Sequence, residues 1–348
     1  MRAGALRPAE IARVANTAET AVQHGQRLPT MLRYRLTARS FPGRSLVSDV
    51  PPHGSDRAGK AKLLLVVLRL AWGLSWPVMM VALAEVTPWT LRALGYANGT
   101  LCMFALAKLR GRSARLPFGV VWAHVVVSAL LTIVGFGLLS TFAQLSALTS
   151  RVAIVTYSMP IWASLLAWLI LGERLNAMSI IGLVLCVGGV TVLIYPLAAM
   201  GIPLGLLLAL GAALIWAAGT VYLKWAQMRG DGIVITAWQL AVSFAVLAGC
   251  VAVFEGTPHL WPLKPATLLA LTFHGLIATG LAYFLWFDIV GRLPAATASL
   301  GSLCVPVVGI VSSMVMLGER PTLADAIGFA LILAAAACVL IAPGGRTG

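Results

Sequence analysis

Two copies of one stretch decide the fold of this chain: PIWASLLAWLILGER at residues 160–174 and PVVGIVSSMVMLGER at residues 306–320. Each copy is a proline, then ten apolar or small residues, then Leu-Gly-Glu-Arg. The second copy lies 146 residues after the first, since 306 − 160 and 318 − 172 give the same difference. A fixed offset of this kind indicates an internal duplication.

The composition indicates a membrane protein. Of the 348 residues, 60% are hydrophobic and 10% are charged, against about 45–50% and about 25% in soluble domains. Such a chain cannot cover its surface with polar groups. The long apolar runs do not alternate with polar residues, which excludes a closed β-barrel.

Ten apolar runs have lengths near the roughly 20 residues that an α-helix needs to cross a bilayer. We therefore predict an all-α integral membrane protein with ten transmembrane helices. The predicted spans are 63–83, 89–106, 118–139, 152–171, 177–194, 203–223, 233–254, 268–289, 295–317 and 323–341.

Five helices per repeat have a geometric consequence. Because five is odd, the second copy must cross the membrane in the opposite sense to the first. The Glu173 turn and the Glu319 turn are then expected on opposite sides. Two inverted five-helix repeats are an architecture of secondary transporters, in which the substrate binds between the repeats near the midplane.

The net charge of +14 comes from basic residues that flank the predicted membrane spans, and it does not indicate nucleic-acid binding. Eleven of the 25 Lys and Arg residues precede Leu63, and four more lie between Lys108 and Arg115. Basic residues are enriched in cytoplasmic connections. We therefore expect a multi-pass protein of the cell membrane with both termini in the cytoplasm. No recognition motif accompanies the charge, so no nucleic-acid partner is predicted.

A wider set of residues, which includes the duplicated stretch, resembles the pattern of a known family. These residues are Trp72-Gly73, Arg92, Pro160 with Leu171-Gly172-Glu173-Arg174, Gly280-Leu281-Ala282-Tyr283, Trp286, Leu293-Pro294-Ala295, and Pro306 with Leu317-Gly318-Glu319-Arg320. The chain resembles the EamA-type family of the drug/metabolite transporter superfamily, over about 63–341. The resemblance implies two EamA domains, ten helices and export or exchange of small metabolites. It also implies a central cavity lined by spans one, three and four and by spans six, eight and nine.

The resulting domain prediction has three parts: 63–195 as the first five-helix repeat, 203–341 as the second, and 1–62 as a basic cytoplasmic tail without fixed structure. An early start codon or an organellar transit peptide are the alternatives for that tail.

Aromatic side chains are the main candidates for substrate binding. Trp72 and Trp76 share one face of the first span with Arg69, and Trp216 lies on the sixth. The resemblance adds further residues on spans that it places around the cavity. The substrate-binding candidates are Trp72, Trp76, Arg92, Tyr157, Trp216, Tyr283 and Trp286. Ordinary core packing is the alternative for the aromatic residues, and an interfacial position is the alternative for Arg92.

Prolines and titratable groups within the spans are the other candidates. Pro160 and Pro306 are expected to bend their helices for gating, with an inert kink as the alternative. Asp288 and His274 are candidates for proton coupling. A surface pair with Arg292 is the alternative for Asp288, and a buried structural histidine is the alternative for His274.

The Leu-Gly-Glu-Arg turns are interpreted as structural corners. Gly172 and Gly318 end a helix in the left-handed conformation. Glu173 and Glu319 are then expected at the start of the following helix, where the helix dipole favours a negative charge.

These features predict a secondary-active transporter that exports or exchanges amino-acid-like, amphipathic or toxic metabolites by alternating access. A lipid-linked or nucleotide-sugar transporter is the alternative among membrane proteins, and an intramembrane enzyme is the alternative from another class. We expect no enzyme activity, because the spans carry no clustered reactive residues. No metal or cofactor is predicted, because Cys and His show no ligand spacing. The expected partners are a small-molecule substrate and the lipid bilayer, and a homodimer is left open.

Overall fold

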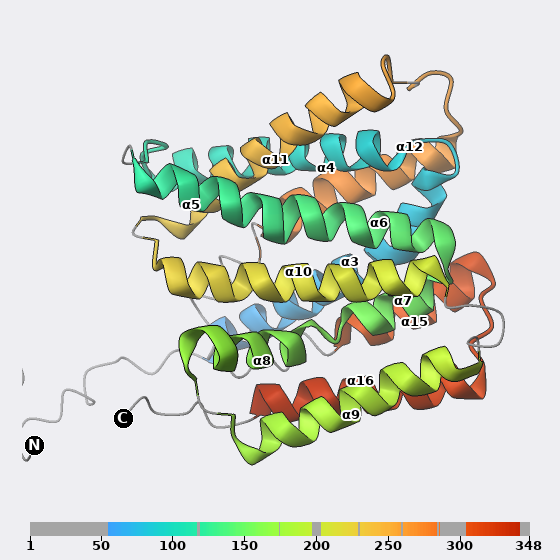
Figure 1. The fold of residues 1–348 in the computed structure, drawn as a ribbon. Helices are drawn as coiled ribbons and strands as arrows, with labels where there is room; N and C mark the ends of the chain where they lie inside the picture. Colours follow the sequence, from blue (N-terminus) through green and yellow to red (C-terminus); the bar gives the residue numbers. More distant parts are fainter. Residues whose placement is uncertain are drawn as a thin grey trace, which may run out of the picture. The chain divides into compact units, whose positions relative to one another are not determined.

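The computed structural model describes residues 55–116, 119–173, 175–196, 203–228, 230–258, 260–283, 285 and 304–341, with side chains from Leu63 to Cys338. Within these ranges all regular structure is helical (Figure 1). The predicted all-α architecture is thereby confirmed. Residues 1–54 of the predicted tail lie outside the described residues. The remaining residues of that tail, 55–62, belong to the first helix, which begins at Ser55 rather than at Leu63.

The helices follow one another as predicted, with some differences in their bounds. Spans one to five are α3 (Ser55–Leu83), α4 (Pro88–Leu109), α5 (Val120–Ala129) with η1 (Leu130–Gly135) and α6 (Phe136–Ser146), α7 (Thr149–Thr156) with α8 (Met159–Leu171), and α9 (Ala177–Ile194). Spans six to ten are α10 (Leu204–Ala226), α11 (Gly232–Phe254), α12 (Pro265–Thr272) with η3 (Phe273–Leu281), α15 (Cys304–Leu317) and α16 (Leu323–Ile341). The third span ends at Ser146 rather than at 139, because its polar residues, Ser140, Thr141 and Gln144, are buried inside the protein.

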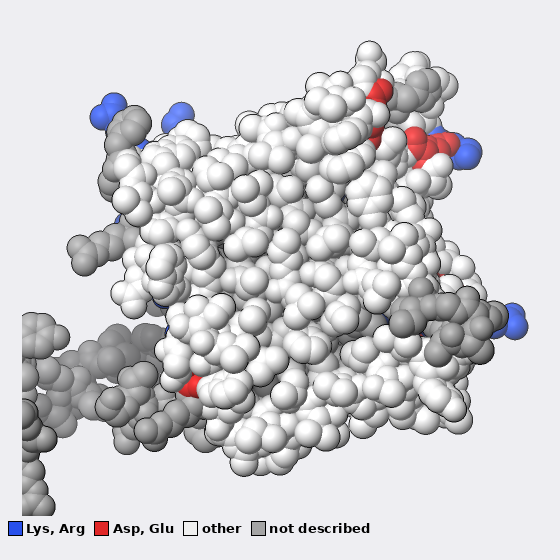
Figure 2. Space-filling model, viewed as in Figure 1, with Lys and Arg blue, Asp and Glu red and all other residues white. Residues whose placement is uncertain are grey.

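Six of the described spans are long and apolar enough to cross a membrane by length and composition: Leu63–Leu83, Val120–Ser146, Thr149–Leu171, Ala177–Ile194, Leu204–Ala226 and Gly232–Phe254. The remaining four predicted spans correspond to α4 and to three shorter apolar helices. On the face drawn in Figure 2, charged side chains gather at the two ends of the helices, and the broad band between them is uncharged. This distribution fits a protein whose helices lie in lipid.

Each repeat packs mainly on the other repeat. Span two (α4) packs along span seven (α11), and span five (α9) packs along span ten (α16). Span one (α3) packs on spans eight and nine, whereas span six (α10) packs on spans three and four. In Figure 1, α10 accordingly lies between α5 and α6 on one side and α8 on the other. The contacts between the two repeats are therefore reciprocal: equivalent spans of the two repeats pack on equivalent partners, as expected of a duplicated chain.

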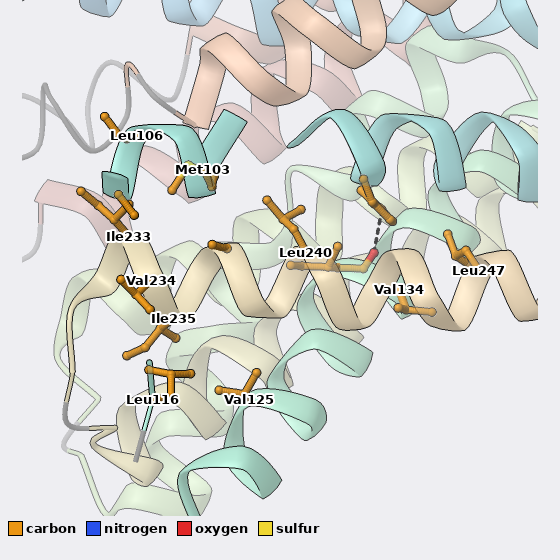
Figure 3. Close-up of a cluster of buried hydrophobic side chains, with 14 of the residues drawn as sticks. Met103, Leu106, Leu116, Val125, Val134, Ile233, Val234, Ile235, Leu240 and Leu247 are labelled. Carbon is orange, nitrogen blue, oxygen red and sulfur yellow. Dashed lines mark hydrogen bonds between the residues drawn. The ribbon is translucent and has the colours of Figure 1, made fainter. Parts of the chain in front are cut away.

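The largest apolar cluster shows how this interlocking is built. Figure 3 shows Met103 and Leu106 of α4 beside Ile233 at the start of α11, with Leu240 further along that helix. All four side chains are buried. The core therefore lies between the repeats, since one wall of this cluster comes from each of them.

The long helix α10 identifies the two ends of the bundle. Near its start, a Cβ atom on Gly205 would lie 2.6 Å from the Cβ atom of Ala147, so the α6–α7 connection is at this end. Near its last turn, Lys224 forms an ion pair with Glu173. At 23 residues α10 spans about 34 Å, enough for a hydrocarbon core of about 30 Å. We call the first end the Glu85 end and the second the Glu173 end, after residues in their connections.

The two glutamate turns lie at opposite ends, as predicted. Glu319 contacts the first residues of α7, beside Ala147 at the Glu85 end, whereas Glu173 pairs with Lys224 at the other end. Gly172 and Gly318 have φ values of 68° and 67°, the left-handed conformation expected of them. Arg174 lies outside the described residues.

One part of the predicted corner was wrong. Neither glutamate starts the next helix, since α9 begins at Ala177 with Asn176 as its cap, and α16 begins at Leu323. Glu319 instead accepts hydrogen bonds from the backbone N–H groups of Thr149 (2.6 Å) and Ser150 (2.9 Å), at the start of α7. The dipole of α7 therefore favours the negative charge of Glu319, but α7 belongs to the other repeat and is not the helix that follows Glu319.

Candidate functional site

The fourth span is broken where the two repeats meet. Helix α7 ends at Thr156 and α8 begins at Met159, and Tyr157 has φ −72° and ψ 4° between them. Pro160 lies in the first turn of α8, where its missing N–H group costs no helical hydrogen bond. Pro306 lies near the start of α15 as described. A discontinuous helix at the repeat interface is a feature of transporter substrate sites.

Two predicted aromatic residues meet at this break, and a third lies one helical turn away. The ring centroids of Trp76 and Tyr157 are 6.5 Å apart, at an interplanar angle of 57°. Trp72 lies one helical turn before Trp76 on α3 and donates its indole N–H to the carbonyl of Ala278 (3.2 Å). The guanidinium of Arg69 lies 5.3 Å from the Trp72 ring centroid. We call Trp72, Trp76 and Tyr157 the aromatic group; it joins spans one, four and eight.

The aromatic group is closely packed in this structure. A cavity of about 10 Å³ lies beside it. Its lining consists of Ile154, Tyr157, Pro306, Phe329, Ile332, Leu333 and Ala336. This volume suits about one water molecule and not a metabolite. A metabolite therefore does not fit beside Tyr157 in this structure.

A second group of predicted residues surrounds Arg92 on α4. The Arg92 Nε atom donates to the Thr141 hydroxyl (2.6 Å), and Nη2 donates to the Ser140 hydroxyl (3.1 Å). His274 of η3 lies over Gly95, since a Cβ atom there would be 3.2 Å from its Nδ1 atom. Tyr283 packs against the large apolar cluster formed by α4 and α11. We call Arg92, Ser140, Thr141 and His274 the Arg92 cluster.

Spans three and eight both contain a π-helical segment. The segments η1 and η3 end at Gly135 and Leu281, which are 146 residues apart, so the feature belongs to the duplicated pattern. A π-helical turn changes the backbone hydrogen-bond register. In η1 the carbonyl of Ile133 accepts from the Tyr96 hydroxyl (2.9 Å), and in η3 the carbonyl of Ala278 accepts from Trp72. Such segments frequently mark functional sites.

The other predicted site residues do not join these groups. Trp216 is half-buried on α10, where its carbonyl accepts from the Thr220 hydroxyl at 2.9 Å. Trp286 and Asp288 lie outside the described residues. Sequence reasoning missed Ser140 and Thr141, because serine and threonine in an apolar span have no pattern that separates a ligand of Arg92 from an ordinary helical residue.

Sequence reasoning also missed the polar contacts that close the Glu85 end. Arg151 of α7 forms a bidentate ion pair with Asp325 of α16 (2.6 and 3.1 Å). Glu85 accepts from the hydroxyl of Thr267 (2.6 Å) and from the backbone N–H of Lys264 (3.0 Å), and it pairs with the Lys264 ammonium. These hydrogen bonds hold the pKa of Glu85 at about 2, below its usual 4.5. Each contact joins one repeat to the other.

The geometry defines a class of protein: a multi-pass helical membrane protein built from two inverted repeats with a broken helix between them. Inverted repeats of this kind occur in transporters. The profile of the EamA-like transporter family matches the chain twice, at residues 59–195 and 203–341. The chain belongs to the EamA-like transporter family, and its class is that of transporters rather than enzymes.

Individual relatives agree with this assignment. The chain is 30% identical over 282 residues to the uncharacterized transporter YvbV of Bacillus subtilis, covering 79% of this chain and 89% of that protein. It is 28% identical over 300 residues to a probable amino-acid metabolite efflux pump of Salmonella typhimurium, covering 80% and 93%. A solved crystal structure superposes with a TM-score of 0.58 at 26% identity, covering 80% of this chain and 96% of that one.

Proposed function

We propose that this chain is a secondary-active exporter of amino-acid-like, amphipathic metabolites that works by alternating access. The observation that carries the proposal is the broken fourth span, with the aromatic group beside it at the junction of the two repeats. A site at that junction faces either side of the membrane as the repeats rock against each other.

The chemistry of the junction supports an amphipathic substrate. Trp72, Trp76 and Tyr157 offer large apolar faces, each with one polar tip. A metabolite with an apolar side chain and a small polar head fits such a surface. The relative from Salmonella typhimurium, a probable amino-acid metabolite efflux pump, supports the same substrate class.

We further propose that the Glu173 end faces the cytoplasm. At this end, the last turn of α4 carries Lys108, and the connection that follows carries Arg110, Arg112 and Arg115. Basic residues of this density favour the cytoplasmic side. The Glu85 end, which Glu319 and the Arg151–Asp325 pair hold closed, would then open for release of the substrate outside.

The test is overexpression of the full chain in bacterial cells, with metabolite profiling of cells and medium, followed by reconstitution in proteoliposomes with each accumulated compound. We expect amino acids or their derivatives to accumulate in the medium and to be transported by the purified protein. Replacing Trp76 with leucine should lower transport about tenfold or more, the loss expected when a large binding side chain is truncated.

Trp168→Leu is the matched control, because Trp168 is 45% exposed on the outside of α8. It should transport at the wild-type rate. The proposal fails if no amino-acid-like compound is transported, or if both tryptophan variants behave alike. If transport is unchanged after the proton gradient is collapsed, the protein works by exchange and not by proton coupling.

A further inference from the structure

Arg92 is a buried positive charge without an acidic partner among the described residues. Its exposed fraction is 9%, and none of the described ion pairs includes it. The described carboxylates are engaged at the two ends of the bundle: Glu85, Glu255, Glu319 and Asp325 at one, and Glu173 and Asp231 at the other. A charge in the membrane interior is costly unless it is paired, and it marks a functional site by default.

The partners of Arg92 hold its guanidinium in place without neutralising it. Thr141 and Ser140 accept from Arg92 and direct their own hydroxyl protons to the carbonyl of Gly137 (2.6 and 3.1 Å). These two bonds use two of the five N–H groups of the guanidinium. The fixed orientation and the remaining donors suit a carboxylate, whose two oxygens match the guanidinium fork.

Two further buried side chains near Arg92 have polar atoms without partners. The exposed fraction of His274 is 4%, and its Nδ1 atom has no hydrogen-bond partner in the described part of the chain. Gln144 is 2% exposed, and both polar atoms of its amide lack a described partner. Gln144 follows Thr141 by three residues and so shares its helix face. A buried polar atom without a partner is costly, so a polar ligand here would relieve that cost.

The Arg92 cluster adjoins the aromatic group. The Thr141 hydroxyl lies 3.8 Å from the sulfur of Met79, and Met79 follows Trp76 by three residues on the same face of α3. Trp76 and Met79 belong to one apolar cluster, together with Leu91, which precedes Arg92. The Arg92 cluster therefore contacts α3 at Met79, about one helical turn from Trp76.

We propose that Arg92 binds the carboxylate of the transported metabolite, with His274 as a second polar contact, while the apolar part of the metabolite lies on the aromatic group. This proposal deepens the proposed function and rests on it. The rival is a purely structural role, in which Arg92 only ties α4 to α6 through Ser140 and Thr141. The two roles differ in whether Arg92 distinguishes a carboxylate from a neutral group of the same shape.

The test compares acids with their amides in proteoliposomes that contain the full chain. The probes are L-phenylalanine and L-leucine, each against its carboxamide, which keeps the side chain and the amino group but lacks the negative charge. For the wild type we expect the acids to be preferred about 10- to 100-fold, the range for a charge-assisted contact. Arg92→Gln should reduce that ratio to near one, and Arg92→Lys should keep part of it.

The ratio is independent of how much protein folds, because a folding defect lowers transport of acid and amide equally. Thr141→Val, which keeps the charge but removes a hydroxyl that positions it, should lower the ratio by a smaller factor. Arg320→Gln, at an exposed arginine of the Glu85 end, is the matched control and should keep the wild-type ratio.

Two results would overturn the carboxylate proposal while leaving the exporter intact. One is an Arg92→Gln variant that still prefers the acids as strongly as the wild type. The other is loss of the preference in Arg69→Gln but not in Arg92→Gln, which would move the contact to α3. If the wild type transports none of the probes and exports no amino-acid-like compound in the profiling experiment, the proposed function itself fails.

Discussion

Glu173 and Glu319 occupy the same place in the two copies of Leu-Gly-Glu-Arg, but their surroundings differ. Glu319 accepts two backbone hydrogen bonds at the start of α7. Glu173 pairs with Lys224, whose side chain is 63% exposed. A helix cap and a surface ion pair have different energetic values, so identical residues make unequal contributions to stability.

We predict that Glu319→Ala lowers the free energy of unfolding by about 1–2 kcal/mol, because the first turn of α7 loses its acceptor. Glu173→Ala, the same change in the other repeat, should stay within about 0.5 kcal/mol, since exposed ion pairs contribute little. Unfolding in mixed micelles of increasing SDS fraction measures both. Equal losses in the two variants would contradict this assignment.

A second residue-scale prediction concerns pH at the Glu85 end. The pKa of Glu85 is lowered to about 2 by the Thr267 hydroxyl and by Lys264. A lowered pKa stabilises the folded protein above the usual value of 4.5, and the contribution is lost as the pH falls toward 2. The melting temperature of the wild type should therefore fall more steeply between pH 5 and pH 3 than that of Glu85→Gln.

The same experiment contains its own check. Glu85→Gln keeps the size of the side chain but cannot titrate, so its remaining pH dependence reports all other groups. Identical slopes for the variant and the wild type would show that the Glu85 contacts with Lys264 and Thr267 do not form in solution.

At the scale of helices, the π-helical segments are the feature that the sequence did not reveal. The length of the continuous apolar runs located spans three and eight, but the side chains of η1 and η3 are as apolar as those of the flanking helices. A change in the hydrogen-bond register of the backbone does not alter the hydropathy of the sequence. The left-handed turns at Gly172 and Gly318 were predictable, because glycine after a long apolar run is the common end of a helix.

We predict that Tyr96→Phe destabilises η1, because the Ile133 carbonyl then loses its hydroxyl donor. The expected loss is about 1 kcal/mol, with faster amide hydrogen exchange within residues 130–135. Tyr195→Phe serves as the control, since Tyr195 is 79% exposed and should leave both quantities unchanged. Unchanged exchange in Tyr96→Phe would mean that the hydroxyl does not hold the π-helical turn.

For the whole molecule, the inverted arrangement was predictable from arithmetic alone: five helices per copy require opposite crossings. The candidate site was only partly predictable. Helical spacing placed Trp72 and Trp76 on one face, but it could not show that Tyr157 would meet them, because that contact depends on the break between α7 and α8. Nor could it show that Thr141 orients Arg92, since the partner lies 49 residues away.

We predict that cysteines placed at positions 173 and 319 react from opposite sides of the membrane. In a variant whose five native cysteines are replaced, a membrane-impermeant maleimide should label Glu319→Cys in intact cells. Glu173→Cys should be labelled only after the cells are permeabilised. Labelling of both from one side would contradict the inverted arrangement, and labelling in the reverse order would overturn only the proposed orientation.

The crossed pairing of α4 with α11 and of α9 with α16 has a consequence for synthesis and assembly. A gene divided between residues 195 and 203 would encode two fragments, each a recognisable family domain yet neither holding a complete core. Each fragment would leave the translocon with an exposed packing surface that only the other fragment can cover. The second half must therefore be made before the first can mature, and the two should restore one working protein when they are expressed together.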